Sequence, residues 1–315
     1  MARKVLIAGI LLACLIGMRT AKAVENFIYT SAGDFDSVKT LLARRDIDGV
    51  QIVYPWRMLE KGKGEYDFSA VERDLAYVQT LRKRLFVQLQ DRFFSIDARL
   101  IPDYLLRDPL YGGGLIKQDD ASGNVGWVTK QWNPHVRARY QALLKALAER
   151  FDGQIGGINL PETAIDVENR KDHGDFTCDR YFHATLDNMT YARKVFKRSA
   201  VVQYVNFWPC EWNNDHRYME RTFAFAAARH IGLGGPDVLP YQRAHMQNAY
   251  PFFNRYKGRL YLVALAVQEP DLDYRHPKTG KRVVKDQQTE FAVDYLGANI
   301  IFWATSAPWL QKPVR

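Results

Sequence analysis

The sequence predicts an α/β fold, a single (β/α)8 barrel (TIM barrel) with a long loop insertion after strand three. Two observations lead to this prediction. Short runs rich in β-branched residues alternate with longer stretches in which apolar residues recur at spacings of three and four, so strand and helix alternate along the chain. Eight such units fit into about 290 residues, close to the roughly 250 residues typical of these barrels.

The predicted strands are short and the predicted helices lie between them. An open doubly wound sheet alternates in the same way, but it usually carries a glycine-rich phosphate loop after its first strand, and residues 30–34 (TSAGD) are not one. The barrel is therefore preferred. The strands are expected at 26–30, 49–54, 84–90, 155–160, 200–207, 237–240, 260–268 and 299–304, and the helices at 34–45, 68–81, 136–151, 178–197, 215–230, 242–256 and 285–296.

The longest connection runs from Asp91 to Gln131. A connection of this length inside a compact domain usually has a function. Its glycines and the turn sequence at 119–124 (DDASGN) predict a β-hairpin at the rim of the barrel mouth.

Residues 1–23 are expected to be a secretory signal peptide, followed by one barrel domain over residues 24–315. Arg3 and Lys4 precede an apolar segment over residues 5–18, and Ala21 to Ala23 (AKA) supply a small-x-small cleavage signal. The apolar segment is shorter than the about 20 residues that span a bilayer. Cys14 leaves a lipoprotein box as a minor alternative. The mature protein is thus expected to be periplasmic or secreted, without a membrane span.

The charge of the chain argues against nucleic acid as a partner. Without the four basic residues of the leader, the formal net charge falls from +9 to +5, and no run of lysine or arginine stands out. We expect a monomer.

The stretch GGINLPETAID, residues 156–166, is an apolar run that ends at Glu162. In a (β/α)8 barrel the carboxyl ends of the strands carry the chemistry, and Glu269 follows the predicted seventh strand in the same way. The two acids are therefore expected to face each other across the mouth. A pair of carboxyl groups in different environments, one protonated and one ionised, is what the cleavage of a glycosidic bond requires.

Together with residues 48–75 (DGVQIVYPWRMLEKGKGEYDFSAVERDL), these strand ends resemble the clan A glycoside hydrolases, the retaining (β/α)8 group. The resemblance runs in outline over nearly all the mature chain and assigns no single family. It implies an enzyme that hydrolyses a β-linked oligo- or polysaccharide, with Glu162 as acid/base and Glu269 as nucleophile. One position departs from the group: Pro161 replaces the usual asparagine before the acid/base, and Asn159 and Asn206 are the nearest substitutes.

The resemblance also implies that neighbouring strand-end residues hold the substrate. The seven tryptophans all fall at strand ends or in the following loops, and flat aromatic faces suit sugar rings. The predicted substrate-binding residues are Tyr54, Trp56, Gln90, Arg92, Asn206, Trp208, Tyr241 and Trp303.

Cys178 and Cys210 follow the fourth and fifth predicted strands, so both belong to adjacent loops on the same face. Export would place them in a compartment where a disulfide persists, and we predict that they form one.

Several alternatives remain at this point. Four other acids on the same side, Asp166, Glu168, Glu211 and Asp271, replace the predicted pair if a strand end is misplaced. No metal or other cofactor is expected, since the histidines form no close ligand pair. The sequence contains no Gly-x-Ser-x-Gly elbow, so a serine hydrolase is not indicated. A carbohydrate-binding barrel without turnover and a lyase or isomerase that uses Arg92 on acidic sugars are the rival functions.

Overall fold

The computed structural model describes residues 23–93, 95–119, 123, 125–167 and 174–313. Nearly all of the predicted leader and most of the turn at 119–124 lie outside these residues, as does Glu168.

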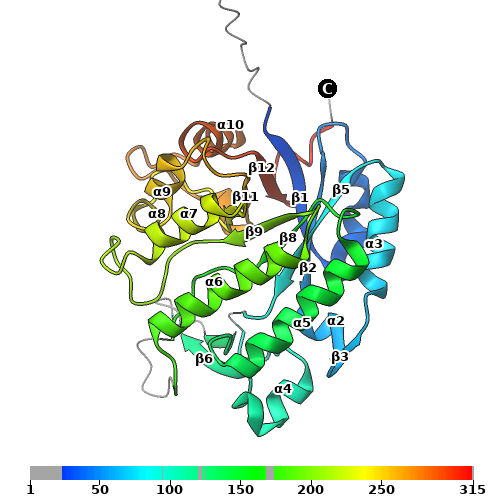
Figure 1. Cartoon of the computed structure of the whole chain (residues 1–315). Coiled ribbons are helices and arrows are strands. Elements are labelled where there is room, and N and C mark those ends of the chain that lie inside the picture. The colour runs from blue at the N-terminus through cyan, green and yellow to red at the C-terminus, as the bar shows by residue number, and fades with distance from the viewer. Residues whose placement is uncertain (1–22, 94, 120–122, 124, 168–173, 314–315) are drawn as a thin grey trace, which may run out of the picture.

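Eight parallel strands close into a barrel in the order β1-β12-β11-β10-β9-β8-β5-β2 (Figure 1), which confirms the predicted architecture. Each strand pairs in parallel with both neighbours, which is the pairing that strand–helix–strand units produce. The barrel strands are β1 (Glu25–Ser31), β2 (Gly49–Pro55), β5 (Arg84–Gln90), β8 (Gly157–Leu160), β9 (Ala200–Tyr204), β10 (Gly232–Gly235), β11 (Val263–Val267) and β12 (Ile300–Ala304).

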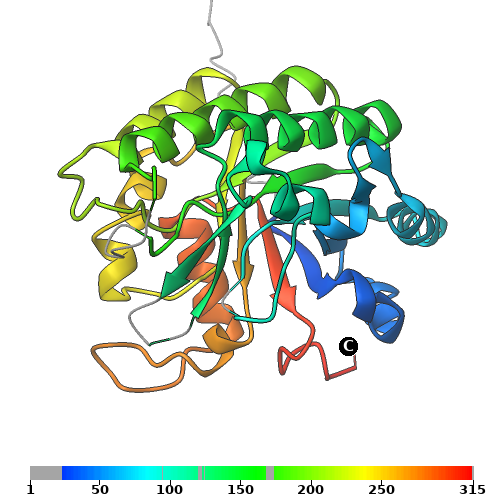
Figure 2. The same ribbon diagram turned by 90° about the horizontal axis from the view of Figure 1, so that it is seen from below.

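The helices surround the barrel, and α5 and α6 lie side by side along its outside (Figures 1 and 2). Three predicted helices are interrupted: the first begins as the 3₁₀ helix η1 (Ala32–Val38), the sixth is two short helices, and the last ends as the π-helical turn η4 (Phe291–Tyr295). The α-helices are α1 (Lys39–Leu42), α2 (Trp56–Leu59), α3 (Ser69–Thr80), α4 (Asp103–Arg107), α5 (Pro134–Phe151), α6 (Cys178–Val195), α7 (Tyr218–Ala228), α8 (Arg243–Met246), α9 (Tyr250–Arg255) and α10 (Lys285–Glu290). The further 3₁₀ turns are η2 (Pro109–Tyr111) and η3 (Pro270–Asp273).

The predicted sixth strand at 237–240 is wrong, since β10 covers Gly232–Gly235. Three of its four residues are glycine, which has low β propensity, so pattern reading passed over them. The barrel requires glycine here. A Cβ on Gly234 would lie 2.0 Å from the Ala264 carbonyl oxygen and 2.8 Å from a ring carbon of Tyr204.

Two apolar layers hold the barrel together. Inside it, Phe27, Phe86 and Phe302 meet edge to face with ring centroids 5.4–5.5 Å apart. A larger layer lies between the strands and the helices. Because both faces of the strands are buried, their sequences are almost continuously apolar, as in other parallel sheets.

The predicted insertion is present and contains an antiparallel hairpin, β6 (Leu115–Asp119) with β7 (Val125–Thr129). Hydrogen bonds tie it to the barrel mouth, among them one from the Thr129 hydroxyl to the Asp91 carbonyl and one from the Asp119 N–H to the Asp166 carbonyl. Within the described residues, no helix is long and apolar enough to cross a membrane.

Candidate active site

A pocket opens at the carboxyl ends of the barrel strands, on the side covered by the β6–β7 hairpin. Its walls come from six strand ends and from the insertion, so it lies where this fold places its chemistry. The lining residues are Tyr29, Gln88, Leu89, Gln90, Arg92, Phe93, Gln118, Pro161, Glu162, Ala164, Tyr204, Asn206, Pro236, Asp237 and Gln268.

Glu162 is an acid of this pocket whose carboxyl group is partly removed from water. It follows β8 and Pro161, and its Oε2 atom is buried without a hydrogen-bond partner among the described residues. Burial raises the pKa of Glu162 to about 7, the negative charge of Asp237 adds to the rise, and Arg92 and a hydrogen bond from Asn206 oppose it. A carboxyl group with such a pKa holds its proton at mildly acidic pH and can donate it.

Arg92 fixes the backbone of Glu162. Its Nη1 donates to the Glu162 carbonyl oxygen at 2.9 Å and to the Tyr181 hydroxyl at 2.7 Å, while its Nε donates to Asp91 Oδ1 at 2.8 Å. The Asp91 carboxylate also accepts from Gln131 Nε2. Most donors of Arg92 are thus engaged within the protein, and its charge is balanced by Asp91.

Asp237 is a second acid of the pocket, and sequence reasoning did not select it. Its Oδ2 lies 3.1 Å from His245 Nε2 and accepts from Asn206 Nδ2 at 3.4 Å. The strand-end rule would have found Asp237 if the sixth strand had been placed at 232–235, since this acid then comes two residues after the strand.

Carboxamide side chains form much of the remaining wall. Gln88 Oε1 and Gln118 Nε2 are buried and have no hydrogen-bond partner among the described residues. Buried polar atoms are normally hydrogen bonded, so each of these two amides has one hydrogen-bonding atom left unused. The lining carboxamides are Gln88, Gln90, Gln118, Asn206 and Gln268.

Glu269, the predicted nucleophile, is exposed and does not belong to the pocket lining. It lies just before the 3₁₀ turn η3 and follows Gln268, which does line the pocket. Its charge still reaches the site, because it helps to raise the pKa of Tyr29, whose side chain forms part of the wall.

Among the eight predicted substrate-binding residues, Gln90, Arg92 and Asn206 line the pocket. The correction concerns the large aromatic side chains: Tyr54, Trp56, Trp208 and Trp303 are at most 1% exposed and belong to the apolar layer outside the barrel.

The reason for this correction lies in strand register and in local hydrogen bonds. Trp303 pairs with Ile28 and therefore points outward, whereas its neighbour Phe302 points inward. Tyr54 donates its hydroxyl proton to Asp74 at 2.7 Å, and Trp56 donates Nε1–H to Glu60 at 2.8 Å, away from the pocket.

Tyr241 is half exposed and packs on Phe291 over a separate hollow, with ring centroids 5.1 Å apart. No tryptophan is among the pocket-lining residues that the structure describes, so the expected tryptophan-walled cleft is not formed there. The aromatic residues that do line the pocket are Tyr29, Phe93 and Tyr204.

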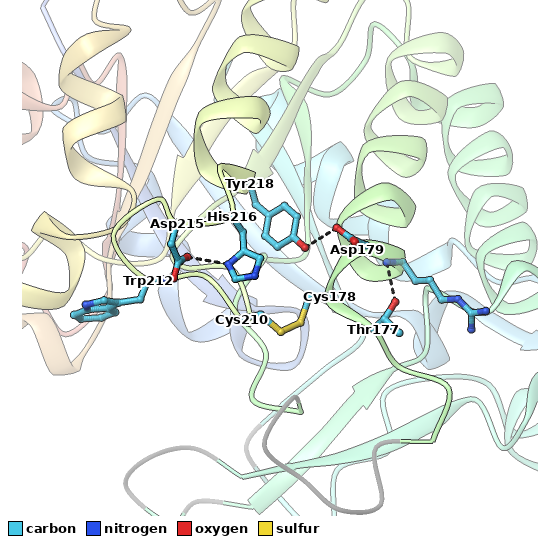
Figure 3. Close-up of a disulfide and its surroundings, with 9 residues drawn as sticks. Thr177, Cys178, Asp179, Cys210, Trp212, Asp215, His216 and Tyr218 are labelled. Atoms are coloured by element: carbon cyan, nitrogen blue, oxygen red, sulfur yellow. Dashed lines mark hydrogen bonds and ion pairs between the residues drawn. A yellow bond between two sulfur atoms is a disulfide. The ribbon is translucent and has the colours of Figure 1, made fainter.

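The predicted disulfide joins Cys178, at the start of α6, to Cys210 (Figure 3). Next to it, the Glu211 carboxylate accepts hydrogen bonds from the backbone N–H groups of Tyr218 and Met219 and so caps α7. The Tyr218 hydroxyl donates to Asp179 of α6 at 2.6 Å, as Figure 3 shows. The disulfide and these hydrogen bonds hold the loops after β8 and β9 together.

Two of the alternative acids have structural roles. Glu211 is the cap just described, and Asp271 is 2% exposed and accepts from the backbone of Val238 and Gln268. Asp166 stays at the hairpin side of the mouth, where its carbonyl accepts from Asp119. Across the described part of the chain, no group of three or more His, Cys, Asp or Glu residues is arranged to hold a metal ion.

No known family model matches the sequence, and no curated protein matches it. Solved structures do match. The catalytic domain of a β-amylase from Paenibacillus polymyxa superposes with a TM-score of 0.60 at 10% identity, over 90% of this chain and 92% of that one. The chain has the fold of these enzymes.

Two xylanases superpose less closely than the β-amylase. A psychrophilic glycoside hydrolase family 10 endo-β-1,4-xylanase gives a TM-score of 0.51 at 12% identity, and a thermostable mutant of a xylanase from Cellvibrio japonicus gives 0.52 at 12%. Each match covers 90% of this chain and 87% of the other. At such identities the likeness establishes the barrel, and the chemistry must be argued from the pocket.

Proposed function

We propose that this protein is an exported glycoside hydrolase of the clan A type, which cleaves a β-linked oligo- or polysaccharide with retention. The observation that carries the proposal is Glu162, a partly buried acid with a buried Oε2 atom and a pKa of about 7, in a carboxamide-lined pocket at the carboxyl ends of the barrel strands. A general acid for glycosidic oxygen needs this protonation state and this position.

The polar wall supports an uncharged sugar as the substrate. Carboxamides donate and accept hydrogen bonds at the same time, as sugar hydroxyls do, and the wall carries five of them. Arg92 is the only cation among the described lining residues, and its contacts with Asp91, Tyr181 and the Glu162 carbonyl leave it little capacity for a substrate carboxylate. This arrangement disfavours a lyase or isomerase that acts on acidic sugars.

Asn206 takes the place of the asparagine that Pro161 replaces. It lines the pocket and hydrogen bonds to the Glu162 carboxyl group, whereas Asn159 is fully buried and does not line the pocket. We assign to Asn206 the contact with a substrate hydroxyl beside the cleaved bond.

Glu269 is the proposed nucleophile, and Tyr29 is the wall residue that its charge reaches. The β-linkage is drawn from the endo-β-1,4-xylanase among the similar structures. Export is supported by the leader sequence and by the disulfide between Cys178 and Cys210.

A carbohydrate-binding barrel without turnover is the second candidate. The observation that favours it is the exposed position of Glu269 outside the pocket lining. Such a protein keeps the sugar-binding carboxamides and does not bring Glu269 to the bond.

The test is a screen of the purified mature protein against a panel of polysaccharides, read by the reducing ends released. Glu162→Gln and Glu269→Gln should each lower turnover by about 10²-fold or more on natural substrates while affinity for the sugar is retained. Glu290→Gln, which removes an exposed glutamate of α10, is the matched control and should behave as the unmodified protein.

Equal product from the protein and from both site variants would remove the catalytic assignment. Sugar binding without product would favour the binding protein. The anomer released first, followed by NMR, decides the stereochemistry, since a separation of about 5–5.5 Å between the two carboxyl groups goes with retention and about 6.5–9.5 Å with inversion.

A further inference from the structure

Asp237 has no part in the proposed reaction, yet it occupies the pocket beside Glu162. It lies in the loop after β10, with its side chain 19% exposed, and its Oδ2 contacts both His245 and Asn206. Asp237 is thus held from the following helix α8 and from the loop after β9.

The hydrogen-bond geometry around His245 shows which of its ring nitrogens carries a hydrogen. Gln242 Oε1 accepts from the backbone N–H of His245 at 3.0 Å, so this atom of the carboxamide must be the oxygen. The same oxygen lies 2.8 Å from His245 Nδ1, which therefore carries a hydrogen. The contact between His245 Nε2 and Asp237 Oδ2, at 3.1 Å, then needs a second hydrogen, which lies between these two atoms.

Contacts with Tyr250 and Asp271 fix the loop that carries Asp237. Tyr250 donates its hydroxyl proton to the Asp237 carbonyl at 3.2 Å and packs its ring on His245, with centroids 4.8 Å apart. Asp271 accepts from the Val238 N–H at 3.1 Å and from the Gln268 N–H at 3.2 Å, which ties the loops after β10 and β11 together. The position of the Asp237 carboxylate is therefore set by the fold.

Asn206 connects this carboxylate to the acid of the proposed reaction, because its amide contacts both Asp237 and Glu162. We propose that Asp237 is a positioning residue of the site: its carboxylate is held in place by His245 and Asn206, and its charge keeps the proton on Glu162. This inference rests on the proposed function of Glu162 as the general acid.

The other charged and titratable groups around the two acids fit this arrangement. Glu162 also faces Arg92, which is balanced by Asp91, and Asp166 on the hairpin side, with Tyr181 and Tyr204 nearby. Asp237 also faces Tyr204, Tyr250 and Asp271. Burial and the charge of Asp237 raise the pKa of Asp271 well above its usual range.

The experiment measures the proton on Glu162 directly, without need of activity. The full mature protein is labelled with ¹³C at the glutamate side-chain carboxyls and titrated by NMR, and the signal of Glu162 is identified by its loss in Glu162→Gln. In Asp237→Asn the pKa of Glu162 should fall by about one unit or more, since a neighbouring like charge disfavours ionisation. Asp237→Glu keeps the charge and should leave the pKa of Glu162 raised.

Asp273→Asn is the matched control, because Asp273 is 84% exposed, pairs with Arg282 and does not line the pocket. It should leave the Glu162 titration unchanged. If hydrolysis is found, the alkaline limb of kcat/KM should move to lower pH in Asp237→Asn together with the NMR value.

A Glu162 titration that is the same in Asp237→Asn and in the unmodified protein would overturn the inference. Recovery of activity in Asp237→Asn by added azide would also overturn it, since Asp237 would then be a reacting carboxylate. A lack of hydrolysis in the unmodified protein contradicts the proposed function alone, because the NMR comparison does not depend on turnover.

Discussion

Arg92 holds Glu162 by its backbone: the Nη1 atom donates to the Glu162 carbonyl oxygen at 2.9 Å, while the carboxylate of Asp91 occupies the other side of the guanidinium. Arg92, in the loop after β5, thus fixes the backbone position of Glu162, which follows β8.

Arg92→Ala should therefore destabilise the protein as well as reduce activity. Removal of one partner of a buried ion pair costs about 3–5 kcal/mol, because the remaining charge on Asp91 is left buried. The free energy of unfolding in urea measures this effect. Arg107→Ala is the control, since Arg107 is 80% exposed and pairs with Asp103 one helical turn away, and the change should stay below about 0.5 kcal/mol.

The activity should depend on pH through Glu162. With a pKa of about 7, the group is protonated below neutral pH and loses its proton as the pH rises, so kcat/KM should fall with an alkaline limb near 7. The measurement is the pH profile on the substrate found in the screen. An alkaline limb above pH 9 would contradict the role of Glu162 as the proton donor.

The same group should make the protein less stable as the pH rises. The pKa of Glu162 is higher in the folded than in the unfolded chain, so between pH about 4.5 and about 7 the folded state binds more protons and stability decreases with pH. Glu162→Gln removes this cost and should stabilise the protein at pH 8 by about 1–3 kcal/mol. At pH 4 the two proteins should unfold at nearly the same urea concentration, which is the internal control.

Gly234→Ala should disrupt the barrel. The new Cβ would lie 2.0 Å from the Ala264 carbonyl oxygen of the neighbouring strand, and neither backbone can move without breaking the ladder. We expect a loss of about 3 kcal/mol or more in the free energy of unfolding, at the upper end of overpacking effects. Gly33→Ala is the control, because nothing lies within 4 Å of its added Cβ.

The disulfide should contribute to stability through the unfolded chain. The bridge between Cys178 and Cys210 closes a loop with a sequence separation of 32, for which chain entropy predicts about 3–4 kcal/mol. The double variant Cys178→Ser with Cys210→Ser should lose about that amount in urea unfolding. A reducing agent should destabilise the unmodified protein and leave the double variant unchanged.

The amino-acid sequence by itself determined the barrel, the hairpin insertion, the disulfide and the strand end that carries Glu162. Each of these could be predicted from local sequence patterns: the periods of strands and helices, turn residues, cysteine positions and an apolar run that stops at an acid. The exception among the strands is β10, in which three of four residues are glycine. Gly234 is needed there because Ala264 of the neighbouring strand approaches closely.

Only the tertiary structure decided which strand-end side chains reach the pocket. Both faces of a strand in a parallel barrel are buried, so hydrophobicity does not tell which of two adjacent residues, such as Phe302 and Trp303, points inward. The meeting of Glu162, Asn206 and Asp237 likewise depends on how the closed barrel brings separate strand ends together. The electrostatics of the site follow from that closure, because charges interact across space, over distances that the order of residues does not specify.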